Sequence, residues 1–142
     1  MRSGVEQRDA ADAYLDRLTA LFPGRLYIEL ARRGDAVEEQ AEAALVDLAY
    51  ARDLPLVATN PANFAEPHMH KAHDAMLCIA ASTQIEAEDR PRSNREAFVK
   101  SDTMMQELFA DLPEAIANTL VIAQRCAFAP PYRKPILPSL AG

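Results

Sequence analysis

The chain has 142 residues, of which 49% are hydrophobic and 25% are charged, and its formal net charge at pH 7 is −6. This length and composition fit one domain of ordinary size with a packed core. The acidic balance argues against a free-standing nucleic-acid-binding domain, which normally carries a basic face. The same balance is compatible with an acidic part of a larger nucleic-acid-processing protein.

The N-terminus and the cysteines bear on the compartment of the protein. The first residues, MRSGVEQRDAADAY, are polar and do not predict a signal peptide, and no apolar run is long enough to span a bilayer. Cys78 and Cys126 lie far apart, each among apolar neighbours. Isolated cysteines make neither a zinc site nor a disulfide framework, so we expect two buried thiols. These features predict a cytoplasmic protein with no membrane contact.

The first expected helix covers residues 5–22, and its apolar positions repeat along one helical face. A Pro-Gly pair at residues 23–24 ends this helix. The next stretch, RLYIEL at residues 25–30, alternates apolar and polar side chains and predicts a strand. The expected buried face of the helix comprises Tyr14, Leu15, Leu18, Leu21 and Phe22.

A second helix is expected over residues 36–52, and the apolar stretch LPLVATN follows at residues 54–60. An uninterrupted apolar run of this length is typical of a strand that is buried on both faces of a parallel sheet. Residues 25–60 therefore predict one βαβ unit. The expected buried face of the helix comprises Val37, Ala41, Leu45, Leu48 and Ala49.

Three more helices are expected: over residues 67–81, after Ser101 as an N-cap, and over residues 113–126. Residues 82–96 are polar and predict an exposed loop, and residues 97–100 allow a short third strand. The expected buried residues are Met69, Ala72, Met76, Leu77 and Ala80 in the first of these helices, Met104, Met105, Leu108 and Phe109 in the second, and Ile116, Leu120 and Ala123 in the third.

The chain has many expected helices and few expected strands. Two parallel strands do not make a stable sheet alone, and a strand like residues 54–60 needs neighbours on both edges. We therefore expect a piece of a larger α/β barrel or sheet. The proline-rich stretch at residues 129–142 cannot be helical and predicts an extended link.

Five stretches, taken together and in order, resemble the bacterial family C replicative polymerases, the DNA polymerase III alpha subunits. They are RLYIELARRGD, LPLVATN, AHDAMLCIA, ELFADLPEAIANTLVIAQRC and KPILPSL. The resemblance implies that residues 1–128 are the C-terminal portion of the PHP (polymerase and histidinol phosphatase) domain and that residues 129–142 lead toward the palm domain. The implied fold class is α/β, a helix-rich partial (β/α) barrel of PHP type present as an incomplete fragment.

The resemblance also implies a function. The parent protein would be a DNA-directed DNA polymerase, a nucleotidyltransferase of DNA replication that needs magnesium, with its catalytic aspartates in the palm and outside this sequence. The fragment alone is expected to be inactive and to hold no cofactor. Its expected partners are the remainder of the alpha subunit and the proofreading exonuclease subunit, with DNA reached only through the parent protein.

The segment after the buried strand is expected to have lost a metal site. Family members with an active PHP site read ATNDxHY there, whereas this chain reads ATNPANF, with Pro61, Asn63 and Phe64 in place of Asp, His and Tyr. An asparagine amide replaces an imidazole ligand poorly, and proline offers no carboxylate. We therefore expect a degenerate site in which Glu29, Asn60 and Asn63 form a vestigial pocket at the strand ends.

All three histidines fall in EPHMHKAHDAM, residues 66–76. On a helix His68 and His70 face opposite ways, whereas His70 can share a face with His73 or Asp74. His70, His73 and Asp74 as replacement metal ligands form the alternative hypothesis, a metal-dependent phosphoesterase or proofreading nuclease of PHP type. The hypothesis that we favour is a structural and interaction module with no intact metal site and no catalytic residues of its own.

A small basic run lies beside the proline-rich stretch. It comprises Arg125, Arg133 and Lys134. These side chains can contact a nucleic-acid backbone or the neighbouring palm, or can simply line a solvated link between domains.

Overall fold

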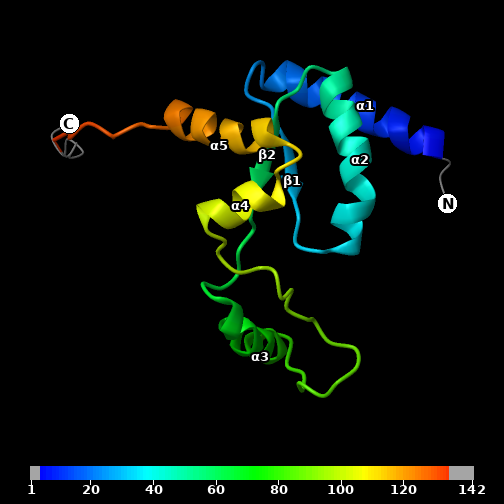
Figure 1. Cartoon of the computed structure of the whole chain (residues 1–142), viewed down its shortest axis with the longest axis vertical. Helices are drawn as coiled ribbons and strands as arrows, with labels where there is room; N and C mark the ends of the chain where they lie inside the picture. The colour runs from blue at the N-terminus through cyan, green and yellow to red at the C-terminus, as the bar shows by residue number, and fades with distance from the viewer. Residues whose placement is uncertain (1–3, 135–142) are drawn as a thin grey trace, which may run out of the picture.

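The computed structural model describes residues 4–134, so residues 135–142 of the expected link lie outside the described residues. Figure 1 shows a unit built around β1 and β2 with α1, α2, α4 and α5, and a second region in which α3 and a long loop lie apart from that unit. The elements are α1 (Gly4–Leu21), β1 (Ile28–Ala31), α2 (Ala36–Ala51), β2 (Leu56–Thr59), the 3-10 helix η1 (Pro67–Met69), α3 (His70–Ala80), α4 (Asp102–Leu108) and α5 (Pro113–Arg125).

Strands β1 and β2 pair in parallel, with Ile28 opposite Leu56, and α2 connects them. The prediction of one βαβ unit over residues 25–60 is therefore confirmed, as is the α/β class. The expected third strand at residues 97–100 is wrong, because Phe98 makes only an isolated parallel bridge with Phe64. Two strands do not identify a barrel, so the PHP-type barrel stays a prediction.

The core lies between the sheet and the helices packed against it. Leu56, Val57 and Ala58 are all buried, which confirms that β2 is covered on both faces, since successive side chains of a strand point to opposite sides. Phe109 is fully buried, with 0% of its surface exposed. The central cluster of buried residues comprises Leu15, Ile28, Leu30, Ala49, Leu56, Ala58, Phe109, Leu112 and Ala115.

Helix α5 covers the free edge of β2. Ile28 donates its backbone N–H to the Pro55 carbonyl at 2.9 Å, so the next carbonyl along β2, that of Leu56, points to the opposite edge. Asn118 on α5 donates its Nδ2 to this Leu56 carbonyl at 2.8 Å. A backbone acceptor that would otherwise be orphaned in the core is thereby satisfied.

Local capping signals place the starts of α2 and α4. Asp35 accepts the backbone N–H of Val37 at 2.8 Å, just after Gly34 turns the chain with a φ of +70°. Ser101 accepts the backbone N–H of Met104 at 3.3 Å, so the predicted N-cap is confirmed. These side chains satisfy donors that the first helical turn leaves without a partner.

The predicted buried faces of four helices are only partly right. Leu15, Ala49 and Phe109 are buried as expected. An apolar stripe predicts which side of a helix seeks a neighbour, but it does not guarantee that residues 4–134 supply one. The expected core residues that are exposed instead are Tyr14, Leu21 and Phe22 in and after α1, Val37 in α2, Met104 in α4, and Leu120 and Ala123 in α5.

Helix α3 turns its polar side inward, which reverses the prediction. Asp74 and Cys78 are the buried residues of α3, whereas Met76 is 64% exposed. Met69, Ala72 and Ala80 are also exposed, and Leu77 is half-buried. The reversal follows from a polar cluster, described below, that pairs Asp74 with the loop at residues 84–96.

The chain exposes more surface than a compact protein of its length. Its accessible surface is 11031 Å², against roughly 7,200 Å² expected for a compact monomer of this size. The excess includes large apolar side chains such as Ile79, which is 77% exposed. Even so, none of the helices described in residues 4–134 is long and apolar enough to cross a membrane.

Candidate functional site

The polar residues expected at the strand ends contact neighbouring strand and loop groups. Glu29 accepts a hydrogen bond from Thr59 Oγ1 at 2.6 Å. Asn60 donates its Nδ2 to the Phe98 carbonyl at 2.8 Å. The exposed Asn63 donates its backbone N–H to the carbonyl one residue before Phe98, at 2.8 Å. Asn60 and Asn63 therefore both contact the segment at residues 97–98, whereas Glu29 contacts β2.

A polar cluster joins α3 to the loop at residues 84–96. We call it the α3 latch. The Asp74 carboxylate accepts hydrogen bonds from Arg90 Nη1 at 3.0 Å, from Arg90 Nη2 at 2.8 Å and from the backbone N–H of Ser93 at 2.8 Å. The members of the α3 latch are His70, His73, Asp74, Arg90 and Ser93.

The two latch histidines both contact Ser93. His70 donates its Nε2 to the Ser93 carbonyl at 3.1 Å, and His73 Nδ1 lies 2.7 Å from Ser93 Oγ. The Phe64 ring packs beside both imidazoles, with ring centroids 6.1 and 5.5 Å apart. Helix α3 thus brings His70, His73 and Asp74 to one inward face, and each of them already has a partner from the loop.

The electrostatics of the α3 latch favour the ionised carboxylate. Hydrogen bonds from Arg90, and then from the Ser93 amide, hold the pKa of Asp74 well below its usual range. In return Asp74 raises the pKa of Arg90. A metal ion at Asp74 would have to displace this bidentate guanidinium. The geometry therefore fits a structural cluster better than a set of metal ligands.

The expectation that residues 82–96 form a uniformly exposed loop is wrong at Arg90. Its side chain is 6% exposed, and that of Asp74 is 13% exposed. A carboxylate that is withdrawn from water needs a cation, and the loop supplies one. The signal in the sequence was Asp74 itself, a charged residue that interrupts an otherwise apolar stretch, AHDAMLCIA.

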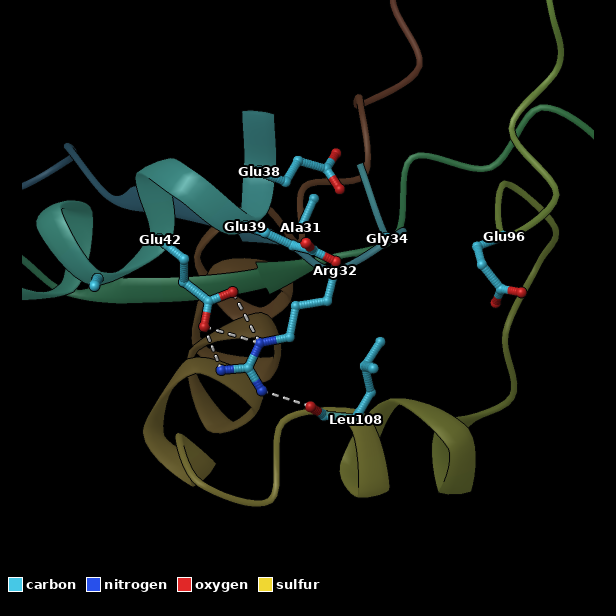
Figure 2. Close-up of a pocket in the computed structure, with 9 residues that line it drawn as sticks. Ala31, Arg32, Gly34, Glu38, Glu39, Glu42, Glu96 and Leu108 are labelled. Carbon is cyan, nitrogen blue, oxygen red and sulfur yellow. Dashed lines mark hydrogen bonds and ion pairs between the residues drawn. The ribbon is translucent and has the colours of Figure 1, made fainter. Parts of the chain in front are cut away.

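A second ionic cluster, at the end of β1, was missed by sequence reasoning. We call it the Arg32 clamp. Arg32 donates to Glu42 of α2 at 2.6 Å and to the Leu108 carbonyl at the end of α4 at 2.6 Å, and Figure 2 shows these contacts converging on one guanidinium. It also donates to both carboxylate oxygens of Asp111, at 2.6 and 2.7 Å. One side chain thus joins β1, α2 and the turn between α4 and α5.

The Arg32 clamp also uses the aromatic core. The Arg32 guanidinium carbon lies 4.5 Å from the centroid of the buried Phe109 ring, a cation–π contact. Hydrogen bonds from Asp111 and then Glu42 raise the pKa of Arg32 further above its usual range, and Arg32 lowers the pKa of Asp111. The carboxylates of Asp111 and Glu42 therefore favour the charged form of Arg32.

A hollow of about 600 Å³ lies beside the Arg32 clamp, and we call it the clamp hollow. Its charged lining residues, all labelled in Figure 2, are Arg32, Glu38, Glu39, Glu42 and Glu96. Glu42 is paired with Arg32, and Glu38 is paired with Arg33. The clamp hollow is therefore acidic, and its Glu38 and Glu42 are already held in ion pairs within the fold.

The basic run that was expected to contact nucleic acid or a neighbouring domain is divided. Arg125 donates to Tyr27 Oη at 2.8 Å and to the Gly24 carbonyl at 2.7 Å, so it ties α5 to the turn after α1. Arg133 and Lys134 are exposed in a segment with no helix or strand. The structure therefore does not join the three side chains in one contact surface.

The prediction of two buried thiols is wrong for one of them. Cys78 is buried on the inward face of α3, whereas Cys126 is exposed just after α5. The end of α5 extends beyond the sheet, so its apolar sequence neighbours do not enclose the thiol (Figure 1).

Residues 4–134 hold no group of three or more His, Cys, Asp or Glu side chains placed to bind a metal ion. His70, His73 and Asp74, although close to one another, are not arranged as such a group.

No protein-family model matches the chain. The curated relatives named "DNA polymerase III subunit alpha" include those of Caulobacter vibrioides, 47% identical over 91% of this chain, and Rickettsia bellii, 38% identical over 96%. The Escherichia coli K12 relative is 42% identical over 74%. The chain spans 11%, 12% and 9% of the length of these relatives, respectively. By sequence, the chain belongs to the family of DNA polymerase III alpha subunits and corresponds to one segment of them.

Proposed function

We propose that the chain is a fragment of a DNA polymerase III alpha subunit and acts in DNA replication as a structural and interaction segment of its PHP domain. The observation that carries the proposal is the identity of 47% over 91% of the chain to a relative of that name. The polymerase activity and its magnesium would belong to other parts of the parent protein.

The surface of the chain supports the role of a segment within a larger body. Its accessible surface of 11031 Å² exceeds that of a compact monomer by roughly half. The sheet described in residues 4–134 has only two strands, fewer than most sheets, and depends on the helices packed against it. Further strands and helices of a PHP-type barrel would cover the exposed apolar faces of α1, α3 and α5.

The loss of metal chemistry is supported by the residues that follow β2. Pro61 and Asn63 stand where active family members carry an Asp and a His. Asn63 is exposed, and the hydrogen bond found for it within residues 4–134 uses its backbone N–H. Neither side chain replaces the ligand that it displaces. The segment would then support the polymerase core structurally and offer a binding surface to the proofreading exonuclease subunit.

The first experiment tests membership of a polymerase. The complete reading frame around this segment is expressed, and primer extension is measured with magnesium for that protein and for the 142-residue chain. We expect extension by the complete protein alone. A complete reading frame that has no polymerase activity would contradict the proposal.

The second experiment tests the interaction role. The full alpha subunit is used to capture the purified exonuclease subunit, with and without Met76→Ser and Ile79→Ser on the exposed side of α3. A matched control carries Thr103→Ser, an exposed and conservative change on α4. Reduced capture of the exonuclease subunit by the α3 variants supports the interaction role. If capture is unchanged, the same kind of substitution is made on the exposed faces of α1 and α5. Unchanged capture by all of these variants opposes the role.

Elemental analysis tests the alternative, a metal-dependent phosphoesterase or nuclease. We expect no stoichiometric zinc, manganese or iron in the purified full-length protein, and no phosphatase activity that a chelator abolishes. Bound metal that is lost in His70→Ala and His73→Ala variants would establish the alternative instead.

A further inference from the structure

A hollow of about 660 Å³ lies beside η1 and the first turn of α3, and we call it the η1 hollow. Its lining includes two basic side chains, Lys71 and Arg95, two histidines, His68 and His70, and one carboxylate, Asp74. The basic side chains come from the two segments that the α3 latch joins, since Lys71 is on α3 and Arg95 is in the loop that carries Arg90 and Ser93.

The positive charges in the η1 hollow are not neutralised by the fold. Among the ion pairs and side-chain hydrogen bonds found in residues 4–134, none involves Lys71 or Arg95. The one lining carboxylate, Asp74, is already bonded to both Nη atoms of Arg90. The carboxylate of Glu66, nearby in sequence, lies 3.0 Å from His68 Nδ1.

The contrast with the clamp hollow sharpens this point. The clamp hollow has a similar volume, but four glutamates line it, and Arg32 there is saturated by its carboxylate partners. On a chain with a net charge of −6, the η1 hollow is thus a local concentration of unpaired positive charge. The α3 latch fixes its two walls relative to each other, so the site is already organised before a ligand arrives.

We propose that the η1 hollow binds a phosphate group between Lys71 and Arg95. A guanidinium offers two parallel donors that match two oxygens of a phosphate, and an ammonium supplies a compact second charge. Two unpaired cations suit a group that carries close to two negative charges at neutral pH. A free phosphate ion or monoester carries this charge on one group, whereas a nucleic-acid backbone offers one negative charge on each of two successive phosphates, and the experiment separates the two sources.

The test follows backbone amide chemical shifts by NMR with the full 142-residue chain at pH 7.5 and constant ionic strength. Inorganic phosphate is added in one series and a short oligothymidine in the other, with chloride as the reference anion. We expect saturable shifts in the amides of residues 67–72 and 93–96. Lys71→Gln and Arg95→Gln should each weaken binding about tenfold.

The matched control is Arg92→Gln, an exposed arginine in the same loop that is not among the lining residues found for the η1 hollow. It should weaken binding less than about twofold, because its charge is screened at this ionic strength. Neither substitution removes a side-chain hydrogen bond or an ion pair found within residues 4–134, and circular dichroism checks that each variant folds.

The outcomes separate cleanly. Binding of inorganic phosphate alone identifies a free phosphate or monoester as the ligand, and binding of the oligonucleotide alone identifies a nucleic-acid backbone. Shifts that chloride reproduces, shifts that fail to saturate, or an equal loss in Arg92→Gln would overturn the site. None of these results depends on whether the parent protein is a polymerase.

Discussion

Two regions of the molecule are held together in different ways. In the unit around β1 and β2, the buried side chains are apolar, with Leu56 2% exposed and Phe109 0% exposed. In the region of α3, the centre is a charged side chain, Asp74, bonded to Arg90 and to the Ser93 amide. Met76 and Ile79 of α3 are exposed, and the buried apolar side chains outside the β1–β2 core are few, among them Cys78 and Phe98.

This difference determines what each region is sensitive to. Apolar burial is non-directional and is worth about 25 cal/mol for each Å² removed from water, so the β1–β2 unit should respond to lost volume. The α3 latch depends on the geometry and ionisation of a few groups, so it should respond to charge and pH. The Arg32 clamp lies between the two cases, since it joins ionic contacts to the Phe109 ring.

The largest expected effect is in the apolar core. Phe109→Ala removes a fully buried ring and should lower the free energy of unfolding by about 3–5 kcal/mol, because a cavity is left among close-packed neighbours. Urea unfolding of the chain, followed by circular dichroism, measures the change. Phe128→Ala is the control, since that ring is 78% exposed. Equal losses in both variants would contradict the placement of the core.

The Arg32 clamp should give the next largest effect. Arg32→Met keeps much of the side-chain volume but leaves Glu42 and Asp111 without their cation. We expect a loss of about 2 kcal/mol, less than for a fully buried pair, because the Asp111 side chain is 64% exposed. The same urea experiment measures it, with exposed Arg133→Met as the control. A loss no larger than that of the control would show that the clamp contributes no stability.

A smaller effect is expected at the start of α2. Asp35→Ala removes the acceptor for the Val37 amide and should cost about 1 kcal/mol. Asp47→Ala, an exposed change within α2, lacks this role and should leave stability unchanged or slightly higher. Equal destabilisation by the two variants would argue against Asp35 as the cap.

Breaking the α3 latch should have a local effect and the smallest effect on the β1–β2 unit. Asp74→Asn removes the charge that holds Arg90, so backbone amides of residues 90–98 should exchange with solvent faster while those of β1 and β2 do not. Hydrogen exchange measured by NMR reads both regions in one sample. Asp89→Asn, in the same loop, is the control. Faster exchange in β1 and β2 would show that the two regions are coupled.

The α3 latch should also open in acid. Because Arg90 lowers the pKa of Asp74, this pair contributes its full stabilisation above the unfolded-state pKa of about 3.9 and loses it progressively as the pH falls through the lower folded-state value. Exchange in residues 90–98, corrected for the intrinsic effect of pH, should be constant from about pH 7 to 5 and rise only below about 4. A rise between pH 7 and 6 would contradict the assignment of this opening to Asp74.

The sequence predicted the positions of the helices and strands better than it predicted which of their side chains are buried. The helix expected at residues 36–52 is observed as Ala36–Ala51, and the one expected at residues 113–126 is observed as Pro113–Arg125. Asp35, Pro113 and the apolar spacing are local signals that act within a few residues. The burial of Leu120 or Met76 depends on a neighbour instead, and residues 4–134 do not supply one.

The candidate site was less predictable for the same reason. The sequence singled out His70, His73 and Asp74, which the structure does bring together, but it did not indicate that Arg90 and Ser93 would engage them. It also gave no sign that Arg32 would join three elements. Among many charged residues, composition does not reveal which pair, because each has several possible partners until the chain is folded.

The sequence by itself determined the βαβ unit, the helix boundaries and the similarity to DNA polymerase III alpha subunits, because periodicity, caps and motifs are properties of short stretches. Only the tertiary structure decided the inward side of α3 and the partners of its charges. Arg90 reaches Asp74 across 16 positions of sequence, and Arg32 reaches Asp111 across 79. Such pairs form only when the chain between the two residues is closed into a loop. The free energy of closing that loop depends on the whole fold rather than on either residue.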